Sequence, residues 1–185
     1  GVADAMEMFK SDGRIKSIGI TALGEIDAIN EVVLSDCFDV AQIYYNLLNP
    51  SASFSSPGEW NDHNFSNLIK NCKSRDMGLM NIRIYAAGYL ATDKRHGREI
   101  PITFGINENE LNRRVEKINS IFNDIEGTKA QKALRYGLSN NDMSTIVIGL
   151  ANIQHLEEAL EGYQLGSLDE EVLIRIKNLQ NNNFS

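Results

Sequence analysis

The feature of this sequence that most limits its fold is the alternation of short apolar runs with amphipathic segments. The apolar runs predict four strands, at residues 15–21, 39–45, 78–86 and 144–148. Apolar residues at helical spacing predict helices at 2–11, 26–34, 65–73, 108–122, 128–138, 153–160 and 169–179. Every connection between successive strands is long enough to contain a helix, so we expect parallel pairing and an α/β fold.

The strands are nearly continuous apolar runs, which is typical of a sheet whose two faces are both covered. Periodicity does not distinguish a four-stranded open sheet from half of a closed barrel. The chain length favours one domain over 1–185, with enough residues for a hydrophobic core. A loop is predicted at 46–61, and the polar tail NNNFS at 181–185 is expected to be frayed.

Charge and hydropathy exclude two classes of partner. A net charge of -7 argues against binding to nucleic acid, which needs a surplus of Lys and Arg. No stretch approaches the roughly 18 apolar residues of a membrane helix, so no membrane partner is expected.

Cysteine usage and the first residues bear on compartment and origin. Cys37 and Cys72 have neither metal-ligand spacing nor the density of a disulfide scaffold, so we expect buried, inert thiols in a reducing, cytoplasmic compartment. The chain begins directly in an amphipathic segment rather than a signal peptide. Such a start resembles a truncated reading frame.

Four segments between Ala5 and Leu160 carry a resemblance to a known family. They are AMEMFKSDGRIKSIGIT, DVAQIYYNLLNP, GLMNIRIYAAGYLAT and KALRYGLSNNDMSTIVIGLANIQHLEEAL. In this order they resemble the aldo-keto reductase motifs G-K-I-R-x-I-G-x-S, Q-x-x-Y-N-L-L, S-P-L-x-x-G-x-L and A-L-R…S-T-V-I-x-G…E-N. The matching residues are Gly13, Arg14, Gly19, Thr21, Gln42, Tyr45, Asn46, Gly88, Leu90, Ala133, Leu134, Arg135, Ser144, Gly149 and Glu158.

The resemblance implies the last four strand-helix units of a (β/α)8 TIM barrel, with NADP or NAD bound across the carboxyl ends of the strands. It also implies an oxidoreductase that transfers hydride between a carbonyl and an alcohol. The IGIT strand and the GYLAT turn are most similar to the aldose and galactose dehydrogenase branch, which implies a small carbonyl or sugar substrate.

By this resemblance, two residues on the first two strands hold the nicotinamide carboxamide. Thr21 stands at the position of a family Ser, and its hydroxyl is able to serve, whereas Ala22 replaces an Asn and is not. Gln42 matches a family Gln whose amide suits the same group. The alternative for Gln42 is a polar residue that satisfies backbone groups at the barrel rim. Tyr45 and Asn46 follow directly, where loops often carry function.

The third segment departs from the family pattern. Arg83, Ile84 and Tyr85 stand where the family has Ser, Pro and Leu, so the resemblance does not imply the usual backbone approach to the diphosphate here. Tyr85 either stacks on the nicotinamide ring or belongs to the core. The charges of Lys94, Arg95, His96 and Arg98 either pair with phosphates or are solvated.

The fourth segment is implied to bind the adenosine end. Gly149 and the helix start near Asn152 offer backbone N–H groups and a positive dipole end to phosphate. His155 falls where relatives place Arg or Gln near the 2'-phosphate, and Glu158 matches the acidic residue that contacts adenine. Neutral His is a weaker anion partner than Arg, so both NADP and NAD stay open.

The family's catalytic Asp, Tyr, Lys and His lie on the first four units, so the resemblance assigns no catalytic residue to this chain. We therefore expect an inactive fragment with weak or absent cofactor binding. The alternative is a non-catalytic module that binds nucleotide or regulates another protein.

Half a barrel exposes two sheet edges and an apolar layer. The expected remedy is a homodimer through those edges. The alternative is a monomer in which the helix at 169–179 shields the exposed strands.

Overall fold

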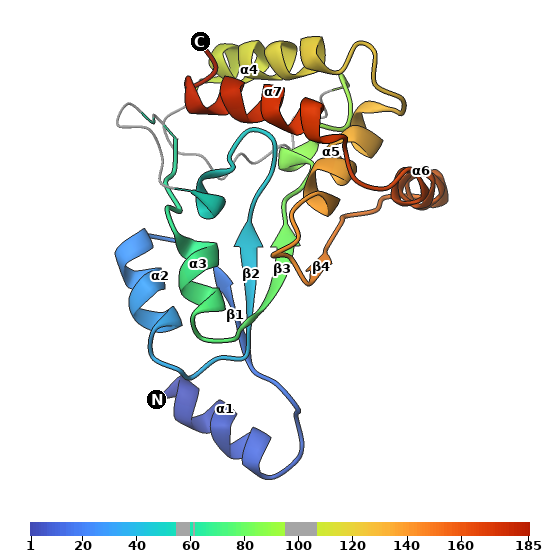
Figure 1. Ribbon diagram of the computed structural model, residues 1–185. Helices are drawn as coiled ribbons and strands as arrows, with labels where there is room; N and C mark the ends of the chain where they lie inside the picture. Colours follow the sequence, from blue (N-terminus) through green and yellow to red (C-terminus); the bar gives the residue numbers. More distant parts are fainter. Residues whose placement is uncertain (55–59, 61, 95–106) are drawn as a thin grey trace.

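The computed structural model describes residues 1–54, 60, 62–94 and 107–185. Its centre is a four-stranded sheet with the order β1-β2-β3-β4, in which every neighbouring pair is parallel (Figure 1). The strands are β1 (Gly19–Ala22), β2 (Val40–Tyr44), β3 (Gly78–Ile82) and β4 (Thr145–Ile146). Helices lie between all successive strands, so the predicted α/β class with parallel pairing is confirmed.

The helices begin and end close to their predicted bounds. They are α1 (Val2–Ser11), α2 (Ile26–Val33), α3 (Leu68–Lys73), α4 (Glu108–Ile121), α5 (Lys129–Leu138), α6 (Ile153–Gln164) and α7 (Glu170–Asn181). Side-chain caps explain the sharp starts of α5 and α6. Thr128 Oγ1 accepts from the Gln131 amide, and Asn152 Oδ1 accepts from the His155 amide. Helix α3 starts later than predicted, because its N-cap Asn67 has a left-handed φ of 64°.

The sheet has one covered face and one open face. Ala41, Ile43 and Leu79 are buried on the face that α3 covers. The opposite face carries one row of in-register partners, Thr21, Gln42, Met80 and Thr145, all exposed or half-buried. In a closed barrel this row would face the interior.

All four strands are shorter than predicted, and the largest differences in bounds are at β1 and β3. β1 begins at Gly19 rather than at residue 15, and β3 ends at Ile82 rather than at residue 86. The cause at β3 is backbone conformation: Arg83, Ala86 and Ala87 have φ of 61°, 46° and 55°. Left-handed residues cannot continue a strand, so the chain turns sharply there.

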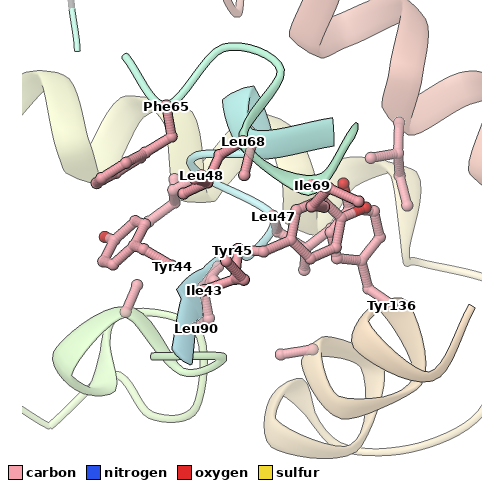
Figure 2. Packing of buried hydrophobic residues seen from close by; sticks show 14 of the residues in the cluster. Ile43, Tyr44, Tyr45, Leu47, Leu48, Phe65, Leu68, Ile69, Leu90 and Tyr136 are labelled. Atoms are coloured by element: carbon pink, nitrogen blue, oxygen red, sulfur yellow. The ribbon is translucent and has the colours of Figure 1, made fainter. Parts of the chain in front are cut away.

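The core fills the space between the sheet and its helices, and continues beyond the carboxyl ends of the strands. Figure 2 shows Ile43 and Tyr45 among the apolar side chains around the loop that follows β2. The rings of Tyr45 and Tyr136 stack with centroids 5.2 Å apart, which joins this loop to α5. Leu47 and Leu68 are almost completely buried in the same cluster.

Buried amides shape the loop after β2. Asn46 is fully buried, and its Oδ1 accepts from the backbone amides of Leu48 and Asn49. Its Nδ2 donates to the carbonyl oxygen of Arg83 at 2.9 Å. The turn after β2 is thereby fixed to the turn after β3.

The C-terminal tail is not frayed, so that prediction is wrong. Phe184 is 0% exposed, and its carbonyl oxygen accepts from Arg113 Nη1 at 2.8 Å. Its ring lies 4.7 Å from the guanidinium carbon of Arg114, and Nη2 of Arg114 donates to Asn183 Oδ1. The tail is ordered because its one large apolar side chain is buried against a cation on α4.

The two ends of the sheet are open in the described structure. β1 and β4 are the edge strands. Helix α7 packs against α4 near the carboxyl ends of the strands and does not lie along β1 (Figure 1). The predicted alternative, in which this helix shields the exposed strands, therefore does not hold for β1. At the amino end of the sheet, α1 buries no residue and is held by the ion pair of Lys10 and Asp39 at 2.7 Å.

The two cysteines differ. Burial raises the pKa of the Cys72 thiol to about 11, so it is inert as predicted. Cys37 is exposed, so the prediction of burial is wrong for this residue, which lies in the connection from α2 to β2. No helix among the described residues is long and apolar enough to cross a membrane.

Candidate functional site

A pocket of about 750 Å³ opens beyond the carboxyl ends of β3 and β4. Its walls come from the turn after β3, the segment after β4 and the first turns of α6. The carboxyl ends of parallel strands are where α/β proteins bind ligands, and the volume is in the usual range for small-molecule sites. This pocket is therefore the candidate site.

Four of the predicted site residues line this pocket: Tyr85, Gly149, His155 and Glu158. They come from three segments that are far apart in the sequence. The parallel order of β3 and β4 brings the first two segments together, and α6 supplies the third.

Tyr85 lies partly in the core and partly in the pocket wall. The side chain is half-buried and packs against the core cluster. Burial, assisted by the negative charge of Glu158, raises the pKa of its phenol to about 12. Tyr85 is therefore a protonated hydrogen-bond donor near neutral pH. The two predicted roles, core residue and ligand contact, are compatible.

Glu158 is held by the start of α5. Thr128 Oγ1 donates to Glu158 Oε1 at 2.6 Å, and Gln131 Nε2 donates to the Glu158 carbonyl oxygen at 3.2 Å. Helix α6 approaches α5 closely because Gly162 has no Cβ, and an added Cβ would lie 3.0 Å from Gln131. The carboxylate is thus fixed at the pocket wall by a neighbouring helix.

The segment before α6 combines an open backbone with a capped helix start. A Cβ added to Gly149 would meet nothing within 4 Å, so the backbone there borders open space. Asn152 caps α6 and does not line the pocket. The Nδ1 atom of His155 lies 3.4 Å from the Ala151 amide and accepts a hydrogen bond from it. Asn152 and His155 therefore stabilise the helix start, and His155 also faces the pocket.

Thr21 and Gln42 lie outside this pocket. They are cross-strand partners on the open face of the sheet, and Thr21 Oγ1 donates to Gln42 Oε1 at 2.9 Å. The structure therefore divides the seven predicted residues into four that line the pocket, the cap Asn152 beside it, and a separate pair on β1 and β2.

Two other residues singled out in the sequence, Tyr45 and Asn46, make contacts within the fold. Tyr45 is buried against Tyr136, and burial raises the pKa of its phenol. Asn46 is the amide that joins two turns. In the loop of Lys94 to Arg98, the Lys94 amide donates to Thr92 Oγ1, and residues 95–98 lie outside the described residues.

Sequence reasoning missed the roles of Arg83 and Thr128. Arg83 lines the pocket, although the sequence marked it only as a departure from a motif. Thr128 contacts Glu158 from another helix. The T-x-x-Q capping pattern of Thr128 and Gln131 marks a helix start, but nothing local to it points to Glu158.

Comparison with known proteins gives the following matches. The model of the aldo/keto reductase family matches residues 1–181. The holo form of aldo-keto reductase AKR11C1 from Bacillus halodurans superposes with a TM-score of 0.72 at 16% identity, over 96% of this chain and 55% of that chain. The apo form of the same protein gives a TM-score of 0.70 at 18% identity, over 96% of this chain and 56% of that chain. The chain thus spans about half the length of these structures. Among curated proteins, no match was found.

Proposed function

Because the chain belongs to the aldo/keto reductase family, we propose that it binds NADP or NAD across the carboxyl ends of its strands, with the adenosine and phosphate parts in the pocket beyond β3 and β4. The observation that carries this proposal is the convergence of Tyr85, Gly149, His155 and Glu158 on one pocket. The family uses nicotinamide cofactors in general. This chain corresponds to the last four strand-helix units of the family's barrel, over 1–185.

The residues of the pocket fit an adenine nucleotide. Gly88 and Gly149 both line it, and a Cβ added to either would meet nothing within 4 Å, so phosphate has room to approach the backbone. The Glu158 carboxylate is an acceptor for an adenine amino group. Both features suit the adenosine and phosphate parts of the cofactor.

The proposed roles follow from position. Glu158 accepts from adenine, and Gly149 with the start of α6 contacts phosphate. His155, held by Asn152, lies where a 2'-phosphate of NADP would be recognised. Thr21 and Gln42 hold the nicotinamide carboxamide, each with hydrogen-bonding capacity beyond the bond that they share. Tyr85 contributes a protonated hydroxyl and a ring face.

The bound cofactor would supply the hydride that is exchanged with a small carbonyl or sugar substrate. The chain's own residues bind and orient it. Tyr85 is poorly suited to general acid-base chemistry because its pKa of about 12 is far above neutral pH. The family resemblance implies acid-base groups on the other half of the barrel, so we expect no reductase activity from the chain alone.

Substitution of Glu158 tests this function. Glu158→Ala should weaken NADPH binding about tenfold or more, because a hydrogen bond to a charged group is lost. Titration followed by nucleotide fluorescence measures the dissociation constants of NADPH and NADH. Glu157→Ala is the matched control, since Glu157 is exposed on the same helix and does not line the pocket. Equal effects of the two substitutions, or no saturable binding of millimolar nucleotide, would contradict the proposal.

The open sheet edges are proposed to be covered by a second copy of the chain. Exposed apolar side chains lie directly after the edge strand β4 and on α6, at Val147, Leu150, Ile153, Leu160 and Tyr163. Several large apolar side chains exposed beside an open sheet edge favour a covering partner. Sedimentation should therefore give twice the chain mass of 20.7 kDa. A stable species of single chain mass at high concentration would exclude the homodimer.

The reducing, cytoplasmic location stays part of the proposal. Both cysteines are free thiols, and the exposed one would be open to oxidation elsewhere.

A further inference from the structure

Arg83 lies at the point where the chain leaves β3, and it borders the pocket. Its side chain is exposed. Its backbone has a φ of 61°, a left-handed conformation that costs a residue with a Cβ about 1–2 kcal/mol. Such a conformation persists only where the surrounding structure holds it.

Two hydrogen bonds hold this turn. The Arg83 carbonyl oxygen accepts from Asn46 Nδ2 at 2.9 Å and from the Ala86 amide at 2.9 Å. Asn46 is fully buried and is itself fixed by the loop after β2. The start of the Arg83 side chain is therefore positioned by a rigid part of the fold, on the pocket side of the turn.

Arg83 forms no ion pair with another described residue, in 1–54, 60, 62–94 and 107–185. The pocket carboxylate, Glu158, already accepts from Thr128. An arginine at a pocket wall that pairs with none of the carboxylates described is suited to an anionic ligand, and its planar fork matches two phosphate oxygens.

We infer that Arg83 binds the diphosphate of the nucleotide in this pocket. The inference rests on the proposed function, because it assumes a nucleotide there. The glycine backbone at Gly88 and Gly149 leaves the space in which the diphosphate lies. Arg83 then supplies the countercharge from the β3 side, and it sets a preference for nucleotides that carry a diphosphate over the bare nucleoside.

Calorimetric titration with ADP and with adenosine separates the phosphate contribution from that of the base. Arg83→Gln should weaken ADP binding about tenfold and leave adenosine binding within about twofold, since one charge-assisted contact to phosphate is removed. Raising the salt concentration should reduce the difference in ADP affinity between the wild type and this variant. Arg175→Gln, an exposed position on α7 with the same change in net charge, should leave both ligands unaffected.

Two results would overturn the inference, and they are distinguishable. In the first, the wild type binds both ligands while Arg83→Gln changes the two dissociation constants equally or not at all. In that case Arg83 does not contact phosphate, and the proposed nucleotide site is retained. If the wild type binds neither ADP nor adenosine, the proposed function fails and the inference fails with it.

Discussion

Replacing Arg114 with Met is expected to lower the free energy of unfolding by about 3–5 kcal/mol, the usual cost of removing one partner from a buried ion pair. The Arg114 side chain is 0% exposed and lies 3.0 Å from Glu110 and 3.7 Å from Asp62. It also lies over the rings of Trp60 and Phe184. Urea denaturation measures the loss. Arg175→Met, at an exposed position on α7, is the control and should change stability by less than about 0.5 kcal/mol.

The pH dependence of this loss identifies Asp62 as the carboxylate left without its partner. Burial raises the pKa of Asp62 to about 6, and Arg114 opposes that rise. A carboxyl whose folded pKa exceeds its unfolded value stabilises the fold when protonated, and this contribution is lost as pH rises through about 6. In the variant, Arg114 no longer opposes the rise in the pKa of Asp62, so ionising Asp62 in the folded state costs more than in the wild type. The substitution should therefore lower the free energy of unfolding more at about pH 8 than at about pH 5.

Asp62→Asn in the Arg114→Met background should remove this difference. Glu110 is not expected to contribute to it, because the hydrogen bond from Arg113 holds the pKa of Glu110 at about 2. A loss that is the same at both pH values would show that Arg114 acts through packing rather than through its charge.

Phe184→Ala is expected to cost about 3 kcal/mol, although the residue is next to the end of the chain. Truncation of a fully buried Phe removes its transfer free energy and leaves a cavity. It also removes the ring that packs against Arg114 and Trp60. Thermal or urea unfolding measures the loss.

Phe9→Ala is the matched control for this substitution. Phe9 on α1 also lies beside an arginine, with Arg14 at 4.1 Å, but its side chain is 42% exposed and α1 buries no residue. We expect a cost below about 1 kcal/mol there. Equal losses in the free energy of unfolding for the two substitutions would show that the tail does not contribute to the core and is frayed, as the sequence predicted.

Local patterns predicted most of the elements, and the reason is physical. The bounds of α1 agree with the sequence prediction, and those of β2 differ by one residue at each end. Helical spacing and apolar runs depend on neighbours in the sequence, so they are readable without the fold. The end of β3 is different, because a hydrogen bond from Asn46 supports the turn at Arg83.

The candidate site was predictable in part. Motif order pointed to Tyr85, Gly149, His155 and Glu158, and all four border one pocket, although their contact with a cofactor stays a prediction. The hydrogen bond from Thr128 to Glu158 was not predictable, because Thr128 caps α5 and Glu158 lies on α6.

The α/β class, the order of strands and helices along the chain, and the family all follow from the amino-acid sequence alone. Three features became visible only in the folded chain: Phe184 is buried, Arg83 borders the pocket, and Thr21 and Gln42 form a separate pair. Each of these depends on contacts between residues far apart in the chain. Periodicity and motifs carry no information about such contacts until the strands are paired and the helices packed.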